Sequence, residues 1–180
     1  METRPRLGLL AALAVSSALT SAGCGRDSRA ATHGGDGGAA APAAAPHGNC
    51  GHSLCGDNFF VDVEPGPACA AGATCAAQLT LAAVGAYHIN DEYPYKFKAD
   101  ESPGAQAVEF LGTDGAGKNV FSKAASDWRK KDEKTGTMTV KWRSGVKGDK
   151  TIAGVFKLSV CSAQNCQLEQ PPVSFTAAVR

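Results

Sequence analysis

Two cysteines near the C-terminus have a spacing that suits thiol–disulfide chemistry. Cys161 ends an alternating segment, and Cys166 begins the return segment after a short polar turn at 162–165. Directly opposed residues of an antiparallel pair have Cα atoms about 4.5–5.5 Å apart, inside the range of about 4.4–6.8 Å that a disulfide tolerates. The pair can therefore form or break a bond with no large backbone movement, either as a redox couple or as a static hairpin bridge.

The alternation before the first cysteine predicts where its sulfur points. Phe156, Leu158 and Val160 share one face, which we assign to the core. Cys161 then falls with Lys157 on the outer face, because successive side chains of a strand alternate. We expect this sulfur to be accessible to a partner thiol, with the Lys157 ammonium favouring its thiolate.

The chain has seven cysteines, and one of them, Cys24, ends the export signal described below. An even number of remaining cysteines in an exported protein indicates disulfides, and six allow 15 connectivities. Sequence alone does not choose among them, but their close grouping favours local pairing. The three local pairs are Cys50 with Cys55, Cys69 with Cys75, and Cys161 with Cys166.

A His/Cys cluster offers a metal-binding alternative. His47, Cys50, His52 and Cys55 are residue types that bind zinc or copper. The cluster lacks the long spacer between ligand pairs, and an oxidising compartment favours a disulfide between its cysteines. No haem attachment motif, phosphate loop or Ser/His/Asp pattern is visible, so no cofactor is implied.

The N-terminus predicts export. Arg4 and Arg6 precede the apolar run 7–19 and the small-residue stretch 21–24, which is the order of a secretory signal. The ending at Cys24 resembles the bacterial lipoprotein signal, in which the cysteine becomes the lipidated first residue of the mature chain. In that family the absence of Asp after the cysteine implies the outer membrane, and Gly25 follows here.

Composition divides the chain into a signal peptide at 1–23, a tether at 24–49 and a domain at 50–180. The tether is rich in Gly, Ala and Pro and has little to bury, so we expect it to be flexible. The rest is long enough for one core. No later segment has the roughly 18 consecutive apolar residues of a membrane-spanning helix, which leaves a lipid anchor as the only membrane contact. A net charge of +1 argues against nucleic-acid binding.

Within the domain, apolar residues recur with a period of two. This pattern and the intervening turn residues predict an all-β antiparallel sandwich, with Trp142 and Phe156 in its core. A helical turn is expected only within 119–131. The alternating segments are 78–83, 93–97, 137–142, 152–160 and 173–179.

Two segments together resemble the N-terminal periplasmic domain of the thiol:disulfide interchange protein DsbD. Residues 85–97, from Gly85 through His88, Ile89 and Asn90 to Phe97, are similar to its Gly-x-His-Ile/Val-Asn…Pro-x-Lys-Leu segment. Residues 160–175 are similar to its Cys…Cys-x-Pro-Pro hairpin. The resemblance covers about 75–180. Four residues separate the cysteines, one fewer than in the best-known members, and 168–170 delay the Pro-Pro pair.

The resemblance implies an immunoglobulin-like sandwich, here as a stand-alone lipoprotein facing the periplasm. Cys161 and Cys166 would take electrons from a membrane-linked thioredoxin-like domain and pass them to periplasmic oxidoreductases. An aromatic side chain caps the pair in the family, and Phe121 is the candidate here. For His88 and Asn90 the match implies no proton transfer, and we expect them to make strand-end hydrogen bonds. The alternatives are a non-catalytic envelope lipoprotein with three structural disulfides and the metal-binding lipoprotein.

Overall fold

The computed structural model describes residues 50–101 and 107–180, which contain twelve strands and no helix. The strands are β1 Leu54–Cys55, β2 Phe59–Glu64, β3 Thr74–Ala83, β4 His88–Ile89, β5 Lys96–Ala99, β6 Val108–Phe110, β7 Val120–Ser122, β8 Trp128–Lys130, β9 Thr135–Ser144, β10 Gly148–Cys161, β11 Cys166–Glu169 and β12 Pro172–Val179. All strand pairings are antiparallel.

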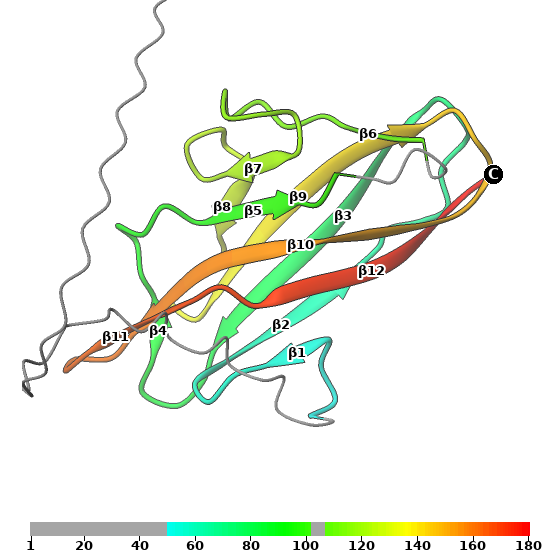
Figure 1. The fold of residues 1–180 in the computed structure, drawn as a ribbon. Coiled ribbons are helices and arrows are strands. Elements are labelled where there is room, and N and C mark those ends of the chain that lie inside the picture. The colour runs from blue at the N-terminus through cyan, green and yellow to red at the C-terminus, as the bar shows by residue number, and fades with distance from the viewer. Residues whose placement is uncertain (1–49, 102–106) are drawn as a thin grey trace, which may run out of the picture. The chain divides into compact units, whose positions relative to one another are not determined.

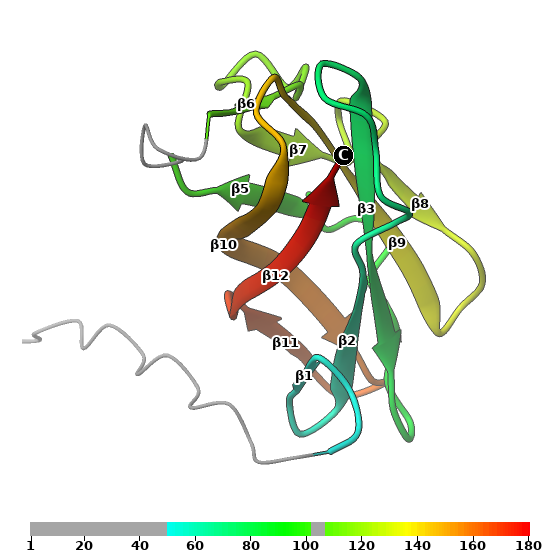
Figure 2. The ribbon, with the colours of Figure 1, turned by 90° about the vertical axis from the view of Figure 1, so that its right-hand side faces the viewer.

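The strands form two facing sheets (Figures 1 and 2). One has the order β1-β2-β3-β9-β6, with β8 also on β9. The other is organised by β10, which pairs with β12 and then β11 along one edge and with β5 and then β4 along the other. The fold is therefore the predicted immunoglobulin-like sandwich, and the end of β10 that carries Cys161 is flanked on both sides.

The core lies between the sheets and contains the predicted residues. Trp142 and Phe156 are both 0% exposed. The alternation of β3, β9, β10 and β12 places one apolar face of each strand in this core, as a half-buried strand requires. The other apolar side chains with 0% exposure are Val61, Ala77, Leu79, Leu81, Tyr95, Phe97, Ala99, Phe121, Met138, Val140, Ile152, Leu158 and Val160.

The helical turn expected within 119–131 is wrong, because this segment is two strands joined by a tight turn. β7 pairs with β5, and β8 pairs with β9. Asp127 holds the turn through its carboxylate, which accepts the Ser122 N–H at 3.1 Å, and the Ser122 hydroxyl accepts the Ala125 N–H at 3.1 Å. Pairing to neighbouring strands and these turn bonds satisfy the backbone without a helix.

One disulfide joins the two sheets. Cys75 lies on β3 of the first sheet, whereas Cys69 is bridged to Val179 on β12 of the second sheet. The Cys69 N–H donates to the Ala178 carbonyl at 3.2 Å, and the Arg180 N–H donates to the Cys69 carbonyl at 2.8 Å. The Cys69–Cys75 bond, with Cα atoms 5.7 Å apart, is thus a covalent link between the layers.

Candidate functional site

The Cys161–Cys166 disulfide closes the β10–β11 hairpin, as the spacing predicted. The two cysteines are register partners, and their Cα atoms are 4.0 Å apart, which is closer than the expected separation of about 4.5–5.5 Å. Beyond them, the Ser162 N–H donates to the Asn165 carbonyl at 2.7 Å. The Ser162 hydroxyl accepts the N–H groups of Gln164 and Asn165, both at 3.2 Å. A serine that binds its own turn in this way fixes the hairpin tip, and the two sulfurs are held opposite each other.

The two sulfurs differ in accessibility, and the predicted access to Cys161 is wrong. Cys161 is only 6% exposed, whereas Cys166 is exposed. The predicted face is right, because the neighbouring Val160 is fully buried in the core. Cys161 nevertheless lies on the central strand of three, with His88 of β4 on one side and Cys166 of β11 on the other. The sulfur open to a partner thiol is therefore that of Cys166.

Six residues on this outer side form two short rows across the three strands, which we call the cysteine face. The first row is set by strand register alone, and it consists of His88, Cys161 and Cys166. The second row consists of Asn90, Ser159 and Leu168. In that row Asn90 Nδ2 donates to Ser159 Oγ at 3.3 Å, and Leu168 is the register partner of Ser159 and 65% exposed. The face thus presents one sulfur beside one large apolar side chain.

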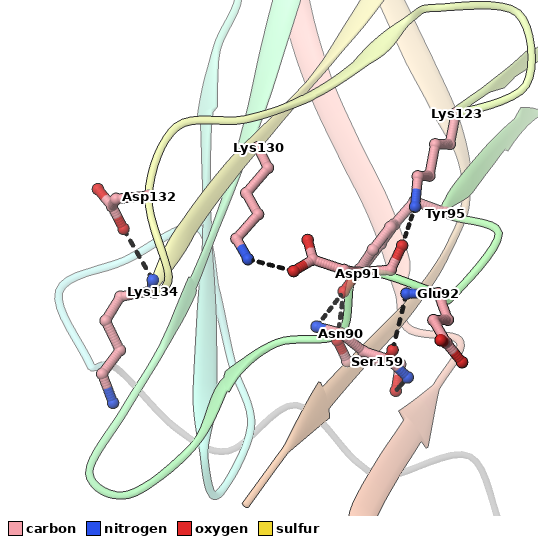
Figure 3. A network of polar contacts seen from close by, with 9 residues as sticks. All are labelled: Asn90, Asp91, Glu92, Tyr95, Lys123, Lys130, Asp132, Lys134 and Ser159. Atoms are coloured by element: carbon pink, nitrogen blue, oxygen red, sulfur yellow. Dashed lines mark hydrogen bonds and ion pairs between the residues drawn. The ribbon is translucent and has the colours of Figure 1, made fainter.

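Tyr95 fixes the edge of the cysteine face from inside the core (Figure 3). Its hydroxyl accepts the Asn90 N–H at 2.9 Å and donates to the Ser159 carbonyl at 2.6 Å. Burial raises the pKa of Tyr95 well above its ordinary value, so the hydroxyl remains a donor at physiological pH. The Asn90 side chain also accepts the Glu92 N–H at 3.0 Å. The prediction of strand-end hydrogen bonds is confirmed for Asn90.

Three lysines hold the loops on either side of β4. Lys130 donates to the Asp91 carboxylate at 2.6 Å, and Lys123 donates to the Asp91 carbonyl (Figure 3). The hydrogen bond from Lys130 is the main cause that lowers the pKa of Asp91 below its ordinary value. Lys134 donates to two carbonyls of the preceding loop, those of Gly85 and Tyr87. These contacts keep β4 against β10, and so keep His88 beside Cys161.

The assignment of Phe121 as the aromatic cap is wrong. Phe121 is fully buried on β7, where it pairs with Phe97 and lies 6.3 Å from the Phe110 ring. β7 pairs with β5 and not with the β10–β11 hairpin, so Phe121 packs in the core. The aromatic side chain that reaches the hairpin is Tyr87, whose hydroxyl donates to Asn165 Oδ1 at 2.9 Å. In the sequence, Tyr87 is the aromatic residue directly before His88 in the segment 85–97, and this position could have identified it as the residue near the hairpin.

Lys157 does not lie close to Cys161. The two residues are on the same side of β10, but they are four residue steps apart, which places their Cα atoms about 13 Å from each other. This exceeds the Debye length of about 8 Å at physiological salt, so the influence of an exposed ammonium on the thiolate is small. Lys157 is exposed and is the register partner of Lys96. The position of Lys157 along the strand therefore gives little support to the predicted influence on the thiolate.

The described part of the proposed metal cluster is not arranged for metal binding. Cys50 and Cys55 form a disulfide, so neither sulfur is a thiolate ligand. His52 Nδ1 lies 3.0 Å from both carboxylate oxygens of Asp62. Within 50–101 and 107–180, no group of three or more His, Cys, Asp and Glu side chains could hold a metal ion. His47 and the predicted lipidation site Cys24 lie outside the described residues.

The comparisons with known proteins show a similarity of fold alone. No family model matches the chain, and no curated protein matches it. A cohesin module of a family 33 glycoside hydrolase from Clostridium perfringens is 10% identical, with a TM-score of 0.37 over 68% of this chain and 96% of the module. AggA, the major subunit of aggregative adherence fimbriae type I from Escherichia coli, is 9% identical, with a TM-score of 0.34 over 72% and 99%.

A third solved structure, an ASH/PapD-like domain of human CEP192, is 14% identical, with a TM-score of 0.30 over 75% of this chain and 98% of that domain. Likeness at this level carries no information on function. The strand order and the disulfides themselves define the class, which is an immunoglobulin-like β-sandwich domain with three disulfides. No membrane-spanning helix is found among the described residues.

Proposed function

We propose that this protein is an exported thiol–disulfide interchange module that relays electrons through Cys161 and Cys166. The asymmetry of the hairpin disulfide carries the proposal, because Cys166 is exposed and Cys161 is 6% exposed. One sulfur can be attacked by a partner, while the other is kept beside it to re-form the bond. Exchange chemistry needs this division between an attacked and a resolving cysteine.

The exchange can be written as two half-reactions. In the first, a donor thiolate attacks the Cys166 sulfur, the bond between the cysteines breaks, and Cys161 leaves as a thiolate. The donor's second thiolate then attacks its own sulfur in the mixed disulfide and releases Cys166, so the donor is oxidised and the hairpin reduced by two electrons. In the second half-reaction the Cys166 thiolate attacks a client disulfide, and Cys161 resolves the new mixed disulfide.

The proposed partners are thioredoxin-like oxidoreductases. Leu168 supports this class, because it is 65% exposed and lies two residues from Cys166 on the same face of β11. An exposed apolar side chain beside a reacting sulfur can bury itself against a partner while the sulfurs meet. One oxidoreductase of this class can act as the electron donor in the first half-reaction, and another can act as the client in the second.

We place this reaction in the periplasm, with the chain anchored in the outer membrane by a lipid on Cys24. The N-terminal pattern of residues 1–24 and three disulfides, which persist in oxidising compartments, support this location. Mass spectrometry of the membrane fraction is expected to find a mature chain that starts at a lipid-modified Cys24. A chain that starts elsewhere, or carries an unmodified Cys24, would contradict the anchor.

A non-catalytic envelope lipoprotein is the second candidate, and the Cys69–Cys75 bond favours it. That disulfide links the two sheets, which is a structural task. If the hairpin disulfide has the same task, its stabilisation is only about 2 kcal/mol in the chain-entropy model, because the closed loop is short.

Reduction potentials separate the two candidates. We expect the Cys161–Cys166 bond to equilibrate at about −180 to −270 mV, where exchange couples operate, and the other two disulfides to lie below about −300 mV. Trypsin makes the measurement specific, since residues 158–180 form one peptide that contains only these two cysteines. Differential alkylation of that peptide across a glutathione series gives the potential. A hairpin potential below about −300 mV would favour the structural role.

A further inference from the structure

We propose that His88 is the charge partner and proton donor for the Cys161 thiolate that is released when Cys166 is attacked. This inference rests on the proposed exchange function and adds a residue to it. His88 on β4 is the register partner of Cys161, and both lie on the outer face, because their neighbours Ile89 and Val160 are the buried pair. Directly opposed side chains have Cβ atoms about 4.5–5.5 Å apart.

The burial of Cys161 creates the need for such a partner. Attack at Cys166 puts a negative charge on a sulfur that is 6% exposed. An anion with little access to water is unfavourable unless a positive charge or a proton compensates for it. A leaving thiolate that is stabilised in this way also leaves faster. Exposed His88 reaches bulk water and can exchange its proton there.

The other ionisable groups around β4 have different partners or positions. Asp91 is bound mainly to Lys130, whose hydrogen bond is the largest cause that lowers the Asp91 pKa, and the charge of His88 is the smallest such cause. Lys134 donates to two carbonyls of the loop before β4. The remaining groups near the strand are Tyr87, whose hydroxyl is bound to Asn165, and the carboxylates of Glu92, Glu133 and Glu169. Imidazole is the side-chain type whose ordinary charge change falls nearest physiological pH, and His88 carries it in register with Cys161.

The proton balance is closed in both directions. When the disulfide opens, the imidazolium of His88 stabilises the Cys161 thiolate and passes it a proton, and the neutral ring takes a proton from water. When a mixed disulfide at Cys166 is resolved, the neutral ring accepts the Cys161 proton, and the thiolate attacks. No electrons pass through His88. It acts only on the Cys161 sulfur, which is the leaving group in one direction and the attacking group in the other.

The rate of opening by dithiothreitol tests this role on the purified protein. Samples are quenched with an alkylating reagent, and peptide 158–180 reports the hairpin disulfide separately from the other four cysteines, which share peptide 30–96. Rates are divided by the thiolate fraction of dithiothreitol at each pH. We expect His88→Gln to open about tenfold more slowly than wild type at pH 6.5 and at the same rate at pH 9, because an imidazole side chain supplies a positive charge and a proton in mildly acidic solution and neither in alkaline solution.

Two further variants make the result specific. His88→Lys keeps a positive charge at both pH values and is expected to remain fast at pH 9. His52→Gln changes a histidine beside the Cys50–Cys55 disulfide and is expected to leave the opening of the hairpin disulfide unchanged. Two results would overturn the role of His88. Either wild type and His88→Gln open at equal rates at both pH values, or His88→Gln opens more slowly than wild type by the same factor at both. Because no protein partner is used, this outcome is independent of whether the protein exchanges disulfides in cells.

Discussion

If the proposed exchange function is right, replacement of Cys161 by serine is expected to accumulate a covalent complex with a thioredoxin-like oxidoreductase, whereas replacement of Cys166 by serine is not. The reason is the unequal access of the two sulfurs, since Cys166 is exposed and Cys161 is 6% exposed. In Cys161→Ser the remaining Cys166 thiolate can attack a client disulfide, but no neighbouring thiol resolves the product. In Cys166→Ser the remaining thiol is that of Cys161, which is buried and therefore cannot readily attack a client disulfide.

The measurement is a non-reducing gel of cells quenched with acid, followed by mass spectrometry of the species that disappears on reduction. Cys55→Ser is the matched control, because it leaves exposed Cys50 as a free thiol on the same domain. We expect no comparable complex from this control. Equal trapping by Cys55→Ser would mean that exposure alone produces the complex, and no trapping by Cys161→Ser would favour the structural candidate.

Trp142→Ala lowers the free energy of unfolding by about 3–5 kcal/mol, as expected for a large aromatic side chain removed from a packed core. The ring is 0% exposed and lies between two register partners, Cys75 on β3 and Phe110 on β6. Urea unfolding followed by circular dichroism gives the change. A loss below about 1 kcal/mol would contradict the central place of this ring.

Trp142→Phe is the informative comparison. Trp142 Nε1 is buried and has no hydrogen-bond partner among residues 50–101 and 107–180, so its N–H contributes a desolvation cost and no bond. Phenylalanine keeps most of the apolar ring and removes this unpaired donor, so we expect a loss below about 1.5 kcal/mol. Leu168→Ala, at an exposed position, is expected to change stability by less than about 0.5 kcal/mol.

Local rules were sufficient for the long core strands, and they favoured the pairing of the cysteines that the structure shows. Alternation of apolar residues identified the core faces of β9 and β10, because one face of each strand is buried along most of its length. The spacing of Cys161 and Cys166 identified the hairpin, because a short turn leaves only one register for two opposed residues. The local pairing of the other two disulfides was also confirmed.

The segment 119–131 shows where local rules stop. Its sequence has too short an alternation to mark a strand, and β7 and β8 form only because β5 and β9 supply their backbone partners. Phe121 was misassigned for the same reason. Its position depends on which strand β7 joins, and that choice is made by packing between distant segments.

The sequence by itself determined that this chain has alternating strands, a cysteine hairpin and an outer face for Cys161. Only the tertiary structure decided which sulfur a partner can reach. β4, which is distant in sequence, pairs beside the end of β10 and places His88 next to Cys161, which is 6% exposed, while Cys166 stays exposed on the neighbouring strand. Alternation reports the face of a strand, but accessibility depends on the strands at its two edges, and those are set by contacts between segments far apart in the chain.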